Sequence, residues 1–314
     1  MRPPVDLRVG CVTWGVSTTW WVSHRRGEIV TVRVSAITKS DVPRVAEFLG
    51  THMGGGVSAR DWADAIDVPW KVDAPNHGFM LVADNAVVGV YLAFYSEREI
   101  GGRIERFCNL GSWCVLPDFR RHSLRLLRAL LSQPGYHFTD LSPSQQVGSL
   151  NTRLGFQALD TSGSLVPAMP VPLWPRRVKV SSSPRVIEDT LAGRDLAIYQ
   201  DHVGAAAALH LVLHARGDSC YVILRKERIR RLPVATVLYV GNPALFGKAA
   251  GTLARHVLVH YHLPALFVES RLGGRRPRIS VPVRLNSNRK MFKSSSLSSD
   301  EIDYLCSELT CVDW

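Results

Sequence analysis

The most informative stretch of this sequence is Trp113-Cys114-Val115-Leu116-Pro117-Asp118-Phe119-Arg120-Arg121-His122-Ser123-Leu124-Arg125. Residues 106–115 predict a strand, and Pro117 ends it because proline lacks an amide donor. Residues 120–131 then show the apolar spacing of an amphipathic helix. The start of a helix exposes unpaired amides and a partial positive charge. A helix that begins directly after a strand therefore favours the binding of a diphosphate.

The segments on either side of this stretch predict a mixed sheet with helices on its faces. Residues 32–37 alternate as a strand, and Ser40 caps the helix that follows. Asp84-Asn85 is a good turn pair between two strands, and Gly155 ends a helix before Phe156 opens the last strand. The expected elements are strand 32–37, a helix through Leu49, helix 59–66, strands 78–84, 87–94 and 106–115, helix 120–131, strand 136–141, helix 146–154 and the strand from Phe156. This order is typical of an α+β fold.

The local sequence and the order of elements resemble those of the GNAT superfamily of acyl-CoA-dependent N-acyltransferases. In that family the fourth strand leads into a helix that begins with Arg/Gln-x-x-Gly-x-Gly/Ala, and Arg120 takes the first position. Downstream, Asn151-Thr152-Arg153-Leu154-Gly155-Phe156-Gln157 resembles the family's closing segment, which ends in Leu-Gly-Phe. The resemblance covers about 130 residues and implies acetyl-CoA or another acyl-CoA as the co-substrate, with no metal. It also implies two sets of cofactor-binding residues, with Cys114 and Val115 for the pantetheine arm and Arg120, Arg121, His122, Ser123, Leu124 and Arg125 for the pyrophosphate.

Two positions depart from the family's pattern. Ser123 and Arg125 stand where glycine is favoured, because a phosphate approaches the backbone closely there and a Cβ interferes. One interpretation is that Arg125 turns aside and offers its guanidinium to a phosphate, since it shares a helical face with Arg121 and Arg128. A second interpretation is that these arginines form a solvated helix face. A third is that CoA no longer binds.

Amine acylation needs a base for the proton of the amine and an acid for the departing thiolate. The family often supplies the acid from a tyrosine four residues before the glycine of Leu-Gly-Phe, and this sequence has Asn151 there, which cannot act as an acid. Glu105 precedes the fourth strand, where such enzymes sometimes place a carboxylate. Glu105 is therefore the candidate base, and its alternative interpretation is a solvated residue at a strand start.

A proline-rich seam divides the chain into two parts. It runs from Pro167 to Arg185 and favours an extended chain. The 314 residues, of which 46% are hydrophobic, are enough for two cores. We expect an N-terminal extension at 1–30, a GNAT-like acyltransferase domain at 31–165, a linker at 166–185 and a diverged GNAT-like domain at 186–314.

The second part loosely follows the order of elements of the first but lacks its phosphate pattern. Helices are expected at 186–191 and from Val203, strands at 209–214, 221–225, 235–240 and 265–270, and a helix up to His260. Gly247-Lys248 is not a P-loop, because the upstream glycine and the following Ser or Thr are missing. Residues 300–309 carry apolar residues at helical spacing and predict a closing helix. We expect this part to serve as a partner domain.

The overall charge narrows the choice of partners only slightly. The net charge is +11, and residues 271–299 contain Lys and Arg without any acidic residue. Only Phe292 is available for base stacking in that stretch, so we expect a solvated basic loop and do not favour nucleic acid. The histidines at 210, 214, 256, 260 and 262 have no carboxylate at ligand spacing, which argues against a metal site.

The remaining features concern the location of the protein in the cell. The six cysteines form neither a CxxC pair nor a regular framework, so a reducing cytoplasm is expected. Residues 9–22 are apolar but interrupted, and we interpret them as an appended segment and not a signal peptide. No run approaches the roughly 20 apolar residues that span a bilayer, so an integral membrane protein is not expected.

The sequence thus predicts an acyltransferase that moves an acetyl or longer acyl group from acyl-CoA to an amine or hydroxyl acceptor by direct attack. The alternative is a catalytically silent GNAT-like scaffold that binds a nucleotide-like ligand or a partner protein. The acceptor, the acyl chain length and the oligomeric state are left open by the sequence.

Overall fold

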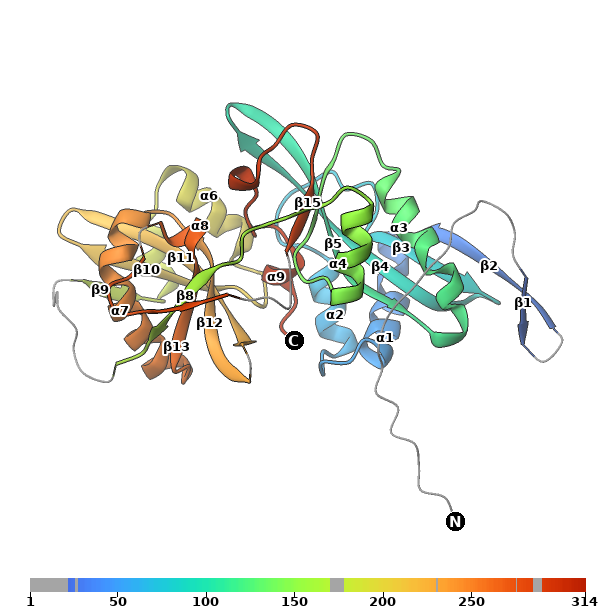
Figure 1. Cartoon of the computed structure of the whole chain (residues 1–314), viewed down its shortest axis with the longest axis horizontal. Helices are drawn as coiled ribbons and strands as arrows, with labels where there is room; N and C mark the ends of the chain where they lie inside the picture. Colours follow the sequence, from blue (N-terminus) through green and yellow to red (C-terminus); the bar gives the residue numbers. More distant parts are fainter. Residues whose placement is uncertain (1–21, 26–27, 170–177, 230, 275, 285–289) are drawn as a thin grey trace, which may run out of the picture.

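A computed structural model describes residues 22–25, 28–169, 178–229, 231–274, 276–284 and 290–314. The predicted segment at 9–22 lies almost wholly outside this range. Two mixed sheets lie side by side, each with helices on both faces (Figure 1). None of the described helices is long and apolar enough to cross a membrane.

The first sheet has eight strands in the order β1-β2-β3-β4-β5-β6-β15-β7. Asp84 and Asn85 both have positive φ, so they form the tight turn between β3 and β4. β5 and β6 are parallel, and the helix between them makes the crossover. The strands are β1 (Val22–Arg25), β2 (Glu28–Ala36), β3 (Gly78–Ala83), β4 (Ala86–Ile100), β5 (Arg103–Val115), β6 (His137–Asp140), β7 (Gln157–Ala158) and β15 (Met291–Lys293).

Helices cover both faces of this sheet. A short 3-10 turn, η1 (Lys39–Asp41), leads into α1 (Val42–His52), which packs with α2 (Ala59–Ile66) on one face. The other face carries α3 (Ser123–Leu131) and α4 (Gln145–Arg153). The 3-10 helix η2 (Pro117–His122) comes directly before α3. The helices predicted from periodicity are therefore confirmed.

The second sheet has seven strands in the order β14-β8-β13-β12-β11-β10-β9. The helix α7 (Pro243–Tyr261) packs on one face, and α5 (Pro184–Thr190) and α6 (Gly193–His202) pack on the other. A short helix α8 (Ser270–Gly273) follows β13. The strands are β8 (Gly163–Pro167), β9 (Lys179–Ser181), β10 (Leu209–Ala215), β11 (Asp218–Ile229), β12 (Leu232–Val240), β13 (Ala265–Glu269) and β14 (Val281–Val283).

The two sheets have the same plan, which confirms the predicted tandem fold. In each, an antiparallel run of three strands is followed by a helix and a parallel strand, β6 in the first sheet and β13 in the second. In each, the next strand comes from elsewhere in the chain. β15 lies between β6 and β7, and β8 lies between β13 and β14. The two halves therefore exchange one strand each.

This exchange corrects the expected simple division into residues 31–165 and 186–314. β8 begins within the first range but pairs in the second sheet. β15 belongs to the second range but pairs in the first sheet. The expected linker also contains β9, an edge strand of the second sheet. The reason is that strand pairing brings together residues that are distant in sequence, and composition does not report it.

The predicted helix at 300–309 is wrong. The chain forms a 3-10 turn η3 (Ser299–Glu301), continues without regular structure and forms a short helix α9 (Glu308–Cys311). Residues 302–312 are nonetheless almost fully buried, because this segment lies between the two halves (Figure 1). A second error concerns the helix expected from Val203, since α6 ends at His202.

Several basic residues of the 271–299 stretch contact the protein itself. Arg271 donates to the carbonyls of Ser299 and Ile302, and Lys293 donates to the carbonyl of Leu154 at 2.6 Å. Lys290 pairs with the buried Glu269 at 2.8 Å. These side chains join segments of the fold, so part of the charge of this stretch has a structural role.

Candidate functional site

The candidate site begins where β5 and β6 diverge. The two strands pair from Phe107 and His137 to Leu110 and Asp140, and β5 then continues alone on that side to Val115. On its other side β5 carries a bulge, because Gly111 pairs with Leu92 but Cys114 pairs with Val90. A bulge turns backbone groups away from the ladder. Within the described residues, the pairing of β5 with β6 stops at Leu110, and the Ser112 amide just beyond it hydrogen-bonds to Glu308.

A cavity of about 410 Å³ lies at this divergence. Its aromatic walls include Tyr91 and Trp113, whose rings stack with centroids 4.5 Å apart. Trp62 of α2 and Trp314 line another part of it, with ring centroids 6.4 Å apart. Asp140 and Ser142 are among the polar residues that line it. The cavity therefore combines apolar walls with a few polar groups, as ligand sites commonly do.

Two buried carboxyl groups lie at the divergence. Asp140 ends β6 and accepts a hydrogen bond from Asn151 Nδ2 at 2.7 Å, and burial raises its pKa to about 7. Burial and, to a lesser extent, the nearby charge of Asp140 raise the pKa of Glu308 to about 8. Perturbed carboxyl groups in a cavity wall are candidates for proton transfer. Because the two groups interact, their titrations are coupled.

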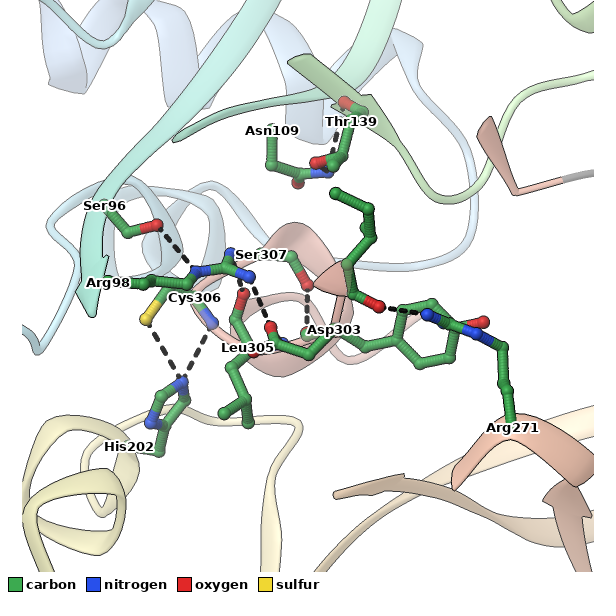
Figure 2. Close-up of polar contacts among 12 residues, drawn as sticks. Ser96, Arg98, Asn109, Thr139, His202, Arg271, Asp303, Leu305, Cys306 and Ser307 are labelled. Atoms are coloured by element: carbon green, nitrogen blue, oxygen red, sulfur yellow. Dashed lines mark hydrogen bonds and ion pairs between the residues drawn. The ribbon is translucent and has the colours of Figure 1, made fainter. Parts of the chain in front are cut away.

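Contacts with β5 and with the loop after β6 hold Glu308 in place. Its amide donates to Asn109 Oδ1 at 3.0 Å, and Asn109 Nδ2 donates to Thr139 Oγ1 at 3.0 Å. The Ser142 hydroxyl donates to Glu308 Oε1. Gly111 leaves the space for this carboxylate, because a Cβ at Gly111 would lie 2.2 Å from Glu308 Oε2. Figure 2 shows Asn109 with its partner Thr139 beside the segment that carries Glu308.

The predicted phosphate-binding residues follow directly on β5. Arg121 is exposed and Arg120 is half-buried, whereas His122, Ser123 and Leu124 are buried. The chain stays helical from Pro117 to Leu131, and the amide of Ser123 donates to the carbonyl of Arg120. This bond occupies one of the amides that the sequence assigned to a pyrophosphate.

The side chains of this stretch also find partners within the protein. Arg125 does turn aside, but its Nη1 donates to the carbonyl of Val32 at 2.9 Å. His122 Nε2 accepts a hydrogen bond from Arg121 Nε at 3.2 Å. Burial, together with the charges of Arg121 and Arg125, lowers the pKa of His122 to about 4. His122 is therefore neutral at pH 7 and adds no charge to the predicted phosphate site.

Cys114 and Val115 lie on β5 beyond the divergence. Their side chains are buried on opposite faces of the sheet, and both residues pair with β4. The backbone edge that faces away from β4 is the one predicted to bind pantetheine. Trp113, which directly precedes Cys114 on β5, lines the cavity.

Of the two residues considered for catalysis, Glu105 lies away from the cavity and Asn151 lies behind its wall. Glu105 Oε2 is 2.9 Å from Nε2 of His137, and Nδ1 of that histidine is 2.9 Å from Ser294 Oγ. Glu105 does not line the cavity, and Leu110 is five positions further along β5, or about 16 Å away. Asn151 is fully buried and contacts Asp140. Its role is to hold that carboxyl group.

Sequence reasoning missed Asp140, Ser142 and Glu308. A weak signal exists for Asp140, because it ends a strand parallel to β5 at the edge where such strands present ligand-binding groups. No sequence pattern marked Glu308 as a site residue, since it was expected on a short helix of the second half. Its burial against Gly111 depends on a contact between residues that are distant in sequence.

No protein-family model matches the chain, and no curated protein matches it by sequence. Solved structures do match. An N-acetyltransferase of the GCN5-related type from Kribbella flavida is 15% identical, with a TM-score of 0.51 over 83% of this chain and 70% of that chain. A protein of the same type from Anabaena variabilis is 11% identical, with a TM-score of 0.50 over 83% of this chain and 72% of that chain. A protein from Pyrococcus horikoshii, described as an acetyltransferase, is 12% identical, with a TM-score of 0.52 over 86% and 92%.

These likenesses and the repeated sheet plan define the class of the fold. The chain has an α+β GNAT fold, present twice in tandem, as predicted from the stretch 113–125 for the first half and from the order of elements for the second. At these identities the comparisons establish the fold alone.

Proposed function

We propose that this protein transfers an acetyl or longer acyl group from acyl-CoA to an amine or hydroxyl acceptor by direct attack. The divergence of β5 and β6 beside the cavity is the observation that carries this proposal. It supplies a stretch of β5 that has diverged from β6, a chamber with apolar walls and a helical segment within a few residues of one another. A long, flexible thioester with a phosphorylated end needs these three features.

In this proposal each part of acyl-CoA contacts a different part of the site. The backbone edge at Cys114 and Val115 binds the pantetheine arm, and the thioester lies near the bulge at Ser112. Arg120, Arg121 and the residues from His122 to Arg125 take the phosphates. The positive charge of Arg121, which is exposed, supports this assignment. The acceptor enters through the part of the cavity lined by Trp62 and Trp314.

A second candidate function is a catalytically silent scaffold. The observation that favours it is the helical continuity of residues 117–131, in which the Ser123 amide already has a carbonyl partner. The bond from Arg125 to Val32 supports it as well, because that guanidinium is engaged within the protein. A scaffold of this kind would still bind a ligand or a partner protein at the cavity.

Calorimetric titration with acetyl-CoA and with a longer acyl-CoA separates these two functions. We expect the wild-type protein to bind both thioesters. The double variant Arg120→Ala, Arg121→Ala should bind them about 10- to 100-fold more weakly, because charge-assisted hydrogen bonds to phosphate are lost. Arg185→Ala is the control, since Arg185 is an exposed residue of α5 in the second half. Absence of binding to either thioester would favour the scaffold.

We place this activity in a reducing cytoplasm. No disulfide links the cysteines within the described part of the chain, which supports this proposal. The partners proposed are acyl-CoA and one acceptor, a small molecule or a protein.

A further inference from the structure

Ser142 connects the cavity to a buried carboxylate. Ser142 lies in the loop after β6, is exposed and lines the cavity. Its hydroxyl donates to Oε1 of Glu308, which is fully buried. A serine in this position can contact a ligand on one side and pass a proton to a carboxylate on the other. The carboxylate itself does not need to reach the cavity.

Glu308 is held on β5 and β6 with little freedom. Its amide is fixed by Asn109 at 3.0 Å, and its carboxylate fills the space above Gly111. A fixed carboxylate requires no reorganisation when a proton arrives, which is how preorganised groups lower a barrier. Because Gly111 has no side chain, the Glu308 carboxylate can occupy this position.

The segment that carries Glu308 is anchored by both halves of the protein. From the first half, Arg98 pairs with Asp303 and donates to the carbonyl of Leu305 at 2.7 Å. From the second half, Arg225 donates to the carbonyl of Leu309 at 3.0 Å, and His202 Nε2 accepts from the Cys306 amide at 2.9 Å. Figure 2 shows Arg98 and His202 reaching this segment from opposite sides.

We propose that Ser142 and Glu308 form a proton relay for the acyl transfer, an inference that rests on the proposed function. The acceptor nitrogen forms a bond to the thioester carbon, and the electron pair of the carbon–sulfur bond leaves with the sulfur of CoA. The acceptor proton passes to Ser142 Oγ while the hydroxyl proton of Ser142 passes to the Glu308 carboxylate. Glu308 then returns its proton to solvent, and the thiolate takes one from solvent. The second half of the protein thereby contributes to the site of the first.

The relay predicts a pH dependence, because Glu308 must be ionised to accept a proton. The charged groups that face Glu308 are Asp140 of β6, which opposes ionisation, and Arg225 of β11, which favours it. The Ser142 hydroxyl and the Ser112 amide also favour it. The rate should therefore rise with pH and level off above about 8.

Steady-state kinetics with acetyl-CoA and a panel of primary alkyl- and arylamines test the relay. Glu308→Gln should lower kcat by about 100-fold or more and remove the dependence on pH, with the Kd for acetyl-CoA unchanged within about twofold. Ser142→Ala should lower kcat by about 10- to 100-fold, and Ser142→Thr, which keeps the hydroxyl, should recover most of the rate. Glu301→Gln and Ser149→Ala are the controls, because both residues are exposed and lie outside the cavity lining. An active Glu308→Gln variant with an unchanged pH profile overturns the relay.

A second measurement separates failure of the relay from failure of the proposed function. If wild-type protein binds no acyl-CoA by calorimetry, the proposed function fails. Carbon-13 NMR of the Glu308 side chain then tests the relay by itself. Removal of the Ser142 hydroxyl should raise the pKa of Glu308, because a donor to the ionised form is lost. A Glu308 titration that Ser142→Ala leaves unchanged contradicts the relay.

Discussion

Gly111 is the residue whose replacement the structure tolerates least at the site. A Cβ there would lie 2.2 Å from Glu308 Oε2 and 3.1 Å from its Cβ, so either the segment that carries Glu308 or β5 would have to move. We expect Gly111→Ala to lower the free energy of unfolding by about 1–3 kcal/mol, as overpacking does. Urea denaturation measures this.

The matched control for Gly111→Ala is Gly148→Ala in α4. A Cβ at Gly148 meets only Met291 Sδ at 3.9 Å, and alanine in a helix is favoured by about 0.5–1 kcal/mol. Gly148→Ala should therefore leave stability unchanged or raise it. Equal effects of the two substitutions would show that Gly111 has room for a side chain.

Glu308 should also make stability depend on pH. Because its folded pKa of about 8 lies above the ordinary value of 4.5, the folded state binds more protons than the unfolded state between these values. Its contribution to the free energy of unfolding therefore falls as pH rises from about 4.5 to about 8, and it is constant above that. Glu308→Gln, which cannot ionise, should remove this decline. Urea denaturation at a series of pH values tests it, and a decline of equal slope in the variant would contradict it.

Glu105 remains a predicted base, and kinetics can decide between it and the relay. Glu105 is paired with His137 outside the cavity lining, so we expect Glu105→Gln to change kcat by less than about threefold. The same assay should show the much larger effect of Glu308→Gln. A loss of 100-fold or more in Glu105→Gln, with acetyl-CoA binding retained, would restore Glu105 as the base.

At the scale of elements, periodic helices and hairpins could be predicted from the sequence, whereas the exchanged strands could not. α3 and α4 show their burial pattern in sequence because one face of each packs on the sheet. β15 and β8 are short and sit between strands from the other half of the chain. Their neighbours are set by tertiary packing, so no local pattern identifies them.

The irregular segment 302–307 depends on the side chains that anchor it. Arg98 pairs with Asp303, donates to the Leu305 carbonyl and stacks over Phe107 with its guanidinium 4.2 Å from the ring centroid. Arg98→Ala should lower the free energy of unfolding by about 1–3 kcal/mol, because buried hydrogen-bonding groups are left unpaired. Chemical denaturation measures the loss. Arg60→Ala, at an exposed position of α2, is the control and should cost less than about 0.5 kcal/mol.

At the scale of the whole molecule, the two halves should not fold separately. A fragment of residues 28–161 lacks β15, which pairs with both β6 and β7, and it lacks the segment that covers Gly111. We expect this fragment to show no cooperative unfolding alone and to gain it when mixed with a fragment of residues 162–314. Thermal denaturation followed by circular dichroism measures both states. Cooperative unfolding of the first fragment alone would contradict the exchange of strands.

The sequence by itself predicted the GNAT fold and the order of the elements in the first sheet from β2 to β6. It did so because strand alternation, helical periodicity and the proline after β5 are local features, each encoded within a few residues. Only the tertiary structure decided the exchange of β8 and β15 and the position of Glu308 beside Ser142. Those depend on contacts such as that between Gly111 and Glu308, in which burial excludes water and sets the pKa. Such contacts join residues that are far apart in the chain, and a single sequence carries no record of which distant residues meet.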